Sequence, residues 1–225
     1  LSEILDSLES PTTLIDCSTI DVEDARKAHK LCKEAGHSFL DAPVSGGVAG
    51  AEAGSLTAMI GGDRSVIDRC STVLEVLFDN VIFCGDAGNG QAAKLCNNML
   101  LAVSMIGVSE SFILGEKLGL SASTLFDVLS TSTGSCWSVN RYCPVADVGP
   151  KSPADNDFKP GFSAKMMLKD MNLAQKAASE SDTATPLGTH AQSLYQDYVN
   201  QQGGAEDFSG ISRFLRSGIR NDSQN

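Results

Sequence analysis

The chain has 225 residues, 42% of them hydrophobic, which is enough to form one or two domains with a substantial core. It carries 28 acidic and 17 basic residues, giving a formal net charge of -11 and an isoelectric point near 4.6. This balance argues against a nucleic-acid-binding surface, because contacts to phosphates need clustered lysine and arginine.

The hydrophobic content does not predict a membrane span. The most apolar stretch is residues 100–118, and four polar side chains interrupt it: Ser104, Ser109, Glu110 and Glu116. No apolar run reaches the roughly 18 residues that a transmembrane helix needs. We therefore expect a soluble protein.

The cysteines and histidines match no metal-binding or disulfide pattern. None of the seven cysteines forms a C-x-x-C pair, and the three histidines form no H-E-x-x-H motif. We expect no zinc site and no disulfide scaffold. An odd, scattered cysteine count is typical of a reducing compartment.

The first elements in chain order are a helix, a strand and a second helix. Apolar residues at helical spacing predict a helix over 1–10, a strand follows over 12–17, and a helix covers 22–35. In α/β sheets, ligands bind beyond the carboxyl ends of the strands, so Ser18 and Thr19 stand where the edge of a cofactor would lie. The alternative is that Thr19 only caps the following helix.

A second strand, over 38–42, leads into the segment Asp-Ala-Pro-Val-Ser-Gly-Gly at 41–47. Glycine pairs after a strand usually mark a bend. Consecutive glycines also expose amide N–H groups, and with Ser45 beside them Gly46 and Gly47 would form a small nest for a carboxylate. Both interpretations stay open on these residues alone.

The alternation of strand and helix continues to residue 84. We predict a strand over 55–60, a helix over 63–77 and a last strand over 81–84. Beyond Gly85 no strand pattern recurs, so the rest of the chain is predicted to be helical.

A glycine-rich approach, Gly-Asp-Ala-Gly-Asn-Gly at 85–90, runs into a long apolar helix predicted over 94–118. Lys94 and Asn98 are four residues apart, so they share one face of this helix. One interpretation is a lysine that extends its ammonium to solvent from a helix end. The other is a proton-transferring lysine whose pKa is lowered by desolvation, with an amide that holds the substrate.

The remaining elements are predicted as helices joined by polar loops. The predicted helices cover 124–129, a stretch beginning at Ser163, 186–202 and 206–216; the loops cover 131–140 and 147–160, and the tail over 217–225 is expected to fray. Trp137 in the first loop is expected to be an apolar anchor. Methionines of the Ser163 helix are expected to fill the core. Lys169 and Asp170, being adjacent, are expected to be a solvated charge patch rather than a same-face ion pair.

Three segments taken together resemble one enzyme family. They are the 41–47 segment, the G-x-x-G-x-G-x-x-x-K-x-x-N-N run from Gly85 to Asn98, and the late Lys169-Asp170 pair. They resemble the β-hydroxyacid dehydrogenase family. The sequence segments at 15–21, 136–145 and 207–216 extend this resemblance over nearly the whole chain.

The resemblance implies a partial Rossmann-type (doubly wound) α/β domain followed by an all-α domain. Residues 1–92 would be the C-terminal part of the dinucleotide-binding domain, and 93–225 an all-helical substrate and dimerisation domain. The family carries a preceding half-domain with a G-x-G-x-x-G turn, and this sequence starts without methionine or leader. We therefore expect a fragment of a longer dehydrogenase.

The resemblance also implies roles for site residues. Lys94 would be the catalytic acid/base and Asn98 would orient the substrate. Ser45, Gly46 and Gly47 would bind the substrate carboxylate. Thr19 and Lys169 would contact the cofactor, NAD. No metal is expected, because lysine and amide donors can stabilise the developing charge.

Within the family, the sequence segment 136–145 resembles that of members that oxidise 3-hydroxyisobutyrate to methylmalonate semialdehyde in valine catabolism. In eukaryotes, the resemblance implies a location in the mitochondrial matrix. Members with a K-x-x-H-N motif, the 6-phosphogluconate dehydrogenases, are disfavoured because Asn97 replaces the histidine. Related semialdehyde reductases stay open as alternatives. So does a catalytically silent dimerisation module. The resemblance further implies a homodimer or homotetramer that binds no nucleic acid and no membrane.

Overall fold

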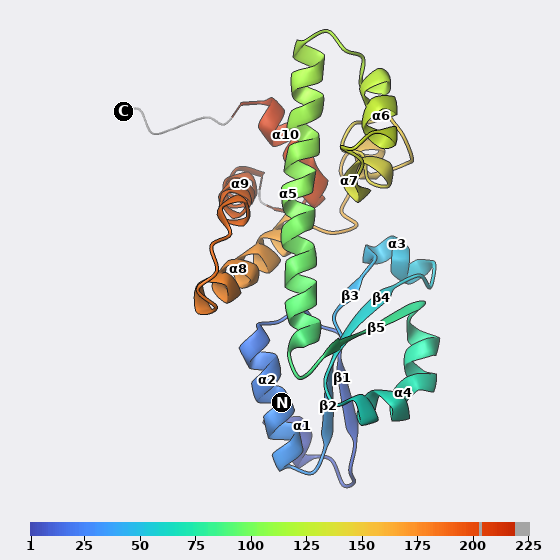
Figure 1. Cartoon of the computed structure of the whole chain (residues 1–225), viewed down its shortest axis with the longest axis vertical. Coiled ribbons are helices and arrows are strands. Elements are labelled where there is room, and N and C mark those ends of the chain that lie inside the picture. Colours follow the sequence, from blue (N-terminus) through green and yellow to red (C-terminus); the bar gives the residue numbers. More distant parts are fainter. Residues whose placement is uncertain (203, 219–225) are drawn as a thin grey trace. The chain divides into compact units, whose positions relative to one another are not determined.

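The computed structural model describes residues 1–202 and 204–218. It contains two compact units, Leu1–Asn97 and Asn98–Asn225. Their boundary falls inside the longest helix, α5 (Asn89–Lys117), and the predicted boundary between residues 92 and 93 falls in the same helix. Each unit is described in turn below (Figure 1).

The first unit is an α/β domain. Its elements are α1 (Ser2–Asp6), β1 (Thr13–Asp16), α2 (Val22–Glu34), β2 (Ser38–Asp41), β3 (Val44–Ser45), α3 (Gly47–Glu52), β4 (Thr57–Gly61), α4 (Arg64–Leu77) and β5 (Asn80–Gly85), followed by the first turns of α5. The predicted alternation of strand and helix is confirmed.

The sheet is mixed rather than wholly parallel. β1 pairs with β2 in parallel, and β4 pairs with β5 in parallel. β2 and β3 both run antiparallel to β4, through Asp41 with Gly61 and through Val44 with Ala58. These two pairings share one register, so β2 and β3 pair one after the other along the same side of β4.

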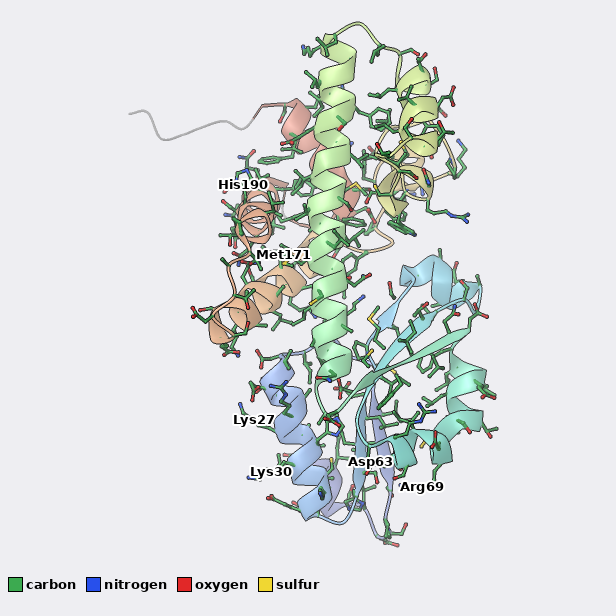
Figure 2. All side chains as sticks on the ribbon, in the orientation of Figure 1. Lys27, Lys30, Asp63, Arg69, Met171 and His190 are labelled. Carbon is green, nitrogen blue, oxygen red and sulfur yellow. The ribbon has the colours of Figure 1, made fainter. Side chains whose placement is uncertain are left out.

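Helices cover both faces of this sheet (Figure 1), because alternate residues of a strand point to opposite faces. On one face Phe39 of β2 packs with Ala28 and Cys32 of α2. On the other, Leu40 of β2 packs in a cluster with residues of β4 and α4: Ala58, Ile60, Val66, Ile67 and Leu74. Lys27 and Lys30 extend from the outer side of α2 (Figure 2) and are 70% and 77% exposed. The doubly wound arrangement is therefore present.

The second unit is all-helical. It contains most of α5, then α6 (Ala122–Thr131), α7 (Trp137–Asn140), η1 (Pro153–Asn156), α8 (Ala164–Glu180), α9 (Pro186–Gln202), η2 (Phe208–Gly210) and α10 (Ile211–Arg216). The N-cap of α8 is Ser163, whose side chain accepts a hydrogen bond from the backbone N–H of Met166, as its position before an apolar helix predicts.

Two apolar clusters form the core of this unit, and α5 contributes to both. One joins Met105 of α5 to Met167 and Met171 of α8 and to α9 and α10; Met171 lies beside α5 in Figure 2. The other joins Phe112 of α5 to α6 and to the segment around Val139. Met167 and Met171 fill the core as predicted, whereas Met166 is 52% exposed.

Asp207 connects several segments of the helical unit through hydrogen bonds. Its buried carboxylate accepts hydrogen bonds from the backbone of Gly161 and Phe162, from Ser209 and from the Tyr142 hydroxyl at 3.0 Å. Burial raises the pKa of Tyr142, so its hydroxyl stays a donor. These hydrogen bonds connect the segment before α8 to η2 and to Tyr142, so we interpret the network as structural.

Several predictions about loops are wrong. The 41–47 segment bends at its glycines, as one interpretation predicts, but it also contains the short strand β3 and the start of α3, which are not predicted. The 147–160 loop contains η1 and buries Phe158, whose ring lies 4.6 Å below the Arg213 guanidinium. Trp137 is 49% exposed and stacks on Tyr142 rather than anchoring a core. Short segments of this kind carry too few periodic residues to be read from the sequence.

The ends of the chain also differ from the prediction. The first helix spans only Ser2–Asp6, and the predicted 206–216 helix is split into η2 and α10. Of the tail predicted to fray, residues 219–225 lie outside the described residues.

By length and hydropathy alone, α5 meets the criterion for a membrane-spanning helix, and in the described residues it is the one helix that does. Its most apolar window is 44% buried inside the protein, and a core helix passes the same test. The criterion by itself is weak support for a membrane span.

Candidate active site

In the α/β unit, the buried carboxylate of Asp41 fixes the start of α5. Asp41 ends β2 and is fully buried. Its two oxygens accept from the backbone N–H groups of Gly88, at 2.9 Å, and Gln91, at 3.0 Å. His29 Nε2 lies 2.7 Å from Oδ1. Free N–H groups at a helix N-terminus favour an anion, so this carboxylate is satisfied by the helix that it positions.

Gln91, also fully buried, connects the first turn of α5 to the loop after β1. Its side chain accepts from the Ile20 N–H at 3.0 Å and donates to the Ser18 carbonyl at 2.8 Å. The loop that carries Thr19 is therefore held to α5 at both sides of that residue.

Asp21, and not Thr19, caps α2. The Asp21 carboxylate accepts from the backbone of Glu23 and Asp24, at 2.8 and 3.2 Å. The interpretation of Thr19 as only a cap is therefore wrong. Thr19 stays in the loop beyond the carboxyl end of β1, where ligands of such sheets bind.

Ser45 ends β3, Gly46 is the N-cap of α3, and Gly47 is the first residue of that helix. Ser45 is half-buried, and both glycines are exposed with φ angles of 139° and 63°. A side chain at Gly46 would also meet Leu56 Cδ2 at 2.8 Å. The glycines thus make the turn into α3 that the structural interpretation predicts. Their binding of a carboxylate stays a prediction.

Lys94 belongs to the second turn of α5 and is 8% exposed. The structure is therefore against the interpretation of a lysine that extends to solvent. Asn98 follows one turn later on the same helix and is 2% exposed, while Asn97 between them is exposed.

In the helical unit, Asn98 lies against Asp170 of α8. Asn98 Nδ2 donates to Asp170 Oδ2 at 2.5 Å, and Lys169 Nζ lies 3.0 Å from Asp170 Oδ1. Asp170 is 2% exposed, whereas the Lys169 side chain is 46% exposed. The prediction of a solvated patch with no pairing is wrong, because the long lysine side chain bends back to its neighbour's carboxylate.

Sequence reasoning missed two of the residues that organise these regions. Asp41 lies within the 41–47 segment but is not singled out by it, and Gln91 occupies an unspecified position of the Gly85–Asn98 motif. The available signal for both is polarity in an apolar setting: an aspartate that ends a buried strand and a glutamine in the first turn of a buried helix.

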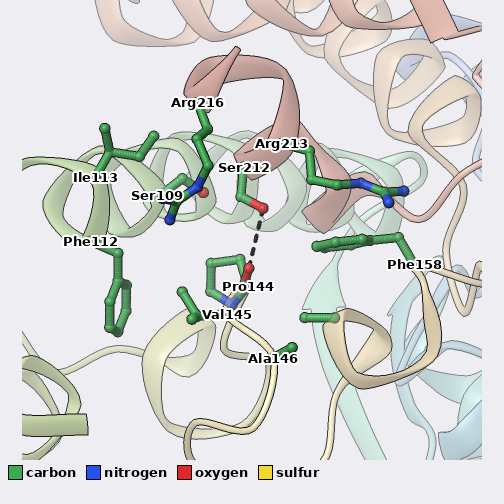
Figure 3. A pocket seen from close by; sticks show the side chains of 11 residues that line it. Ser109, Phe112, Ile113, Pro144, Val145, Ala146, Phe158, Ser212, Arg213 and Arg216 are labelled. Atoms are coloured by element: carbon green, nitrogen blue, oxygen red, sulfur yellow. Dashed lines mark hydrogen bonds between the residues drawn. The ribbon is translucent and has the colours of Figure 1, made fainter. Parts of the chain in front are cut away.

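The helical unit also contains a small pocket of about 180 Å³ (Figure 3). Phe112, Phe158 and Arg216 are among its lining residues, and no predicted site residue of the described chain is. Arg216 pairs with Glu116, and Arg213 pairs with Asp157 at 2.8 Å, so carboxylates already neutralise its arginines. It is not assigned to the active site.

The described residues hold no group of three or more histidine, cysteine, aspartate or glutamate side chains that could bind a metal ion. The chemistry available to the predicted site residues is that of an amine, amides and hydroxyls.

Two sequence profiles of protein families match the chain. Residues 88–215 match the family described as "NAD-binding of NADP-dependent 3-hydroxyisobutyrate dehydrogenase". Residues 1–85 match the "NAD binding domain of 6-phosphogluconate dehydrogenase". Together they indicate a chain that binds a nicotinamide cofactor, NAD or NADP.

Curated relatives carry related names. A probable 3-hydroxyisobutyrate dehydrogenase of Mycobacterium tuberculosis is 49% identical over 96% of this chain and 73% of its own length. An NAD-dependent L-serine dehydrogenase of Pseudomonas aeruginosa is 43% identical over 91% and 68%. A mitochondrial 3-hydroxyisobutyrate dehydrogenase of Drosophila melanogaster is 43% identical over 94% and 65%. The relatives thus include bacterial and mitochondrial proteins.

Solved structures agree with these relatives. The 3-hydroxyisobutyrate dehydrogenase of Mycobacterium tuberculosis with L-serine is similar with a TM-score of 0.91 and 49% identity, covering 96% of this chain and 74% of that one. Psf3 in complex with NADP+ and 2-OPP is similar with a TM-score of 0.80 and 25% identity, covering 94% and 72%. The chain belongs to the 3-hydroxyisobutyrate dehydrogenase family, within the β-hydroxyacid dehydrogenases.

Proposed function

We propose that this protein oxidises 3-hydroxyisobutyrate to methylmalonate semialdehyde with NAD. The observation that carries the proposal is the pair of buried polar residues on α5, Lys94 and Asn98, which are 8% and 2% exposed. Polar side chains are uncommon among buried residues, and an amine followed one turn later by an amide offers a proton acceptor and an orienting group on one face of the helix.

The reaction removes a hydride from the carbinol carbon and a proton from its hydroxyl. When bound, the nicotinamide cofactor supplies the acceptor for the hydride. The neutral amine of Lys94 takes the hydroxyl proton, so that the C–O bond becomes a carbonyl and the lysine becomes an ammonium. A general base must be unprotonated, so the proposal requires the neutral amine of Lys94.

Asn98 is proposed to orient the substrate, and Asp170 fixes the direction of its amide. An ionised carboxylate only accepts hydrogen bonds, so the amide nitrogen of Asn98 faces Asp170 and its oxygen points elsewhere. The ammonium of Lys169 lowers the cost of burying the Asp170 charge. This pairing supports a fixed, rather than a rotating, amide.

The carboxylate of the substrate is proposed to bind Ser45, Gly46 and Gly47. Exposed glycines with positive φ present backbone N–H groups without a side chain in the way, and the Ser45 hydroxyl adds a further donor. Thr19 and Lys169 are proposed to contact the cofactor. These two side chains suit its nicotinamide end; the G-x-G-x-x-G turn that binds a pyrophosphate does not occur in this sequence.

NAD is proposed as the cofactor because the Pseudomonas aeruginosa relative is named NAD-dependent. Psf3, which was solved with NADP+, and the NADP-dependent family description support the alternative. A comparison of activity with each nucleotide decides between them.

A second candidate substrate is L-serine. It is favoured by the L-serine dehydrogenase relative and by the similar structure solved with L-serine. L-Serine shares a carboxylate and a primary alcohol in the β position with 3-hydroxyisobutyrate, so the same residues would serve both. The two differ at the α carbon, where an ammonium replaces a methyl group.

The biological setting is part of the same proposal. We place the reaction in valine catabolism, within a homodimer or homotetramer, and in the mitochondrial matrix if the source is a eukaryote, as in the mitochondrial relative from Drosophila melanogaster. Gel filtration with light scattering tests the assembly. A monomer at micromolar concentration would contradict it.

The test of the function is a comparison of substrates. The purified chain is assayed for NADH formation with 3-hydroxyisobutyrate and with L-serine, and for NADH consumption with a semialdehyde in the reverse direction. We expect the highest kcat/KM for 3-hydroxyisobutyrate. A higher value for L-serine would replace the substrate and retain the mechanism, whereas no activity with any of them would favour the catalytically silent dimerisation module.

A further inference from the structure

We propose that Gln91 is a positioning residue for the cofactor loop. Specifically, it holds the loop over residues 18–20 to α5, so that Thr19 keeps a fixed place relative to the helix that carries Lys94. The inference rests on the proposed function for the role of Thr19, but the attachment itself is independent of any activity.

The contacts of Gln91 join segments that are about 70 residues apart in the sequence. The side chain bonds the Ile20 N–H at 3.0 Å and the Ser18 carbonyl at 2.8 Å, and these two residues flank Thr19. The Gln91 side chain is fully buried, whereas Ser18 is exposed and Ile20 is half-buried, so the amide binds a surface loop from the interior. Both polar ends of the amide are therefore used on one loop.

A glutamine is required by the chemistry of the two partners. A backbone N–H needs an acceptor and a backbone carbonyl needs a donor, and a carboxamide supplies one of each. A glutamate at this position would keep the acceptor but turn an anion toward the Ser18 carbonyl. A methionine would fill the same space and remove both hydrogen bonds to the loop.

The position of Gln91 is itself fixed. Its backbone N–H donates to Asp41 Oδ2 at 3.0 Å, and Asp41 also receives Gly88 and contacts His29. Because Lys94 follows three residues later on the same helix, the loop and the lysine share one rigid support. The loop lies beyond the carboxyl end of β1, where a cofactor of this type of sheet binds.

The first experiment measures amide hydrogen exchange at Ile20 in the full chain. Gln91→Met is expected to raise the exchange rate of Ile20 by about tenfold or more, the effect of losing one hydrogen bond. Gln91→Glu keeps the acceptor and is expected to give a smaller increase. The control is Gln196→Met, since Gln196 is an exposed glutamine of α9. Unchanged exchange at Ile20 in Gln91→Met would overturn the attachment, whether or not the chain is active.

The second experiment separates positioning from chemistry. In Gln91→Met, the KM for NAD is expected to rise about tenfold while kcat stays within about threefold, because the lost bond serves binding. Gln91→Glu should lie between this variant and the unaltered chain. A loss of kcat with unchanged KM would overturn the positioning role. Absence of activity in the unaltered chain would instead be a failure of the proposed function, which the exchange experiment distinguishes.

Discussion

Lys94 is the residue on which the proposed chemistry depends. Lys94→Ala removes the proton acceptor and is expected to lower kcat by about 100-fold or more, with little change in the unfolding midpoint. Lys27→Ala is the control, because Lys27 is 70% exposed and pairs at the surface with Asp24. Steady-state kinetics and thermal unfolding of both variants give the answer. Retention of the unaltered rate in Lys94→Ala would remove this lysine from the mechanism.

Asp170 is expected to act through Asn98. Asp170→Asn places an amide where a carboxylate stood, so the Asn98 amide loses its fixed orientation, and kcat/KM is expected to fall about 10- to 100-fold. Asp24→Asn is the matched control, since it breaks an exposed pair of the same type. Equal kinetics of Asp170→Asn and the unaltered chain would limit Asp170 to packing.

At the scale of single residues, the sequence indicates candidate site residues better than it indicates their hydrogen-bond partners. Because motif spacing is local, the motifs single out Lys94, Asn98 and Ser45 as candidate site residues, and the roles of these residues stay predictions. The bond from Asn98 to Asp170 joins residues 72 apart, and no local pattern contains it. The same holds for Gln91 and the loop before α2.

The start of α5 is tightly packed around Gly90. A Cβ at Gly90 would lie 2.7 Å from the Asp41 carbonyl oxygen and 2.8 Å from Asp41 Oδ2. Gly90→Ala is therefore expected to cost about 1–3 kcal/mol of unfolding free energy by overpacking. Gly107 of the same helix has nothing within 4 Å of such a Cβ, so Gly107→Ala is expected to stabilise by about 0.5–1 kcal/mol. Urea unfolding of the two variants compares these effects, and a neutral Gly90→Ala would contradict the tight contact.

The N-terminus of α4 supports a prediction about pH. Hydrogen bonds from the Ser65 hydroxyl and backbone lower the pKa of Asp63 from its ordinary 3.8. A carboxyl group whose folded pKa is depressed stabilises the fold above its unfolded pKa, and this contribution is lost as the pH falls below about 3.8. Asp63→Asn keeps a capping side chain without the titration. Its unfolding free energy is expected to fall less steeply with acid, and an identical slope would contradict this account.

Elements with long periodic patterns are predictable from this sequence, and short ones are not. The helix Pro186–Gln202 is predicted at both of its ends, and the four longer strands are all found. β3, with two residues, follows from its pairing with β4, which periodicity does not encode, and α3, with six residues, is too short to show a helical period.

At the scale of the whole molecule, the α/β unit and the helical unit follow from the order of the predicted elements, and the family follows from motifs and relatives together. The net charge of -11 does not favour an anionic substrate in general. The substrate carboxylate therefore depends on local donors such as Ser45 and the glycines after it. Composition thus argues against a nucleic-acid surface and does not identify the metabolite.

The most direct test of the central claim is calorimetric titration of the 225-residue chain with NAD and NADH, combined with an assay of NADH formation from 3-hydroxyisobutyrate. The account predicts binding of NADH, with a Kd in the range of about 1 μM to 1 mM, and turnover that Lys94→Ala abolishes. Absence of binding by either nucleotide, or turnover that survives Lys94→Ala, would contradict it.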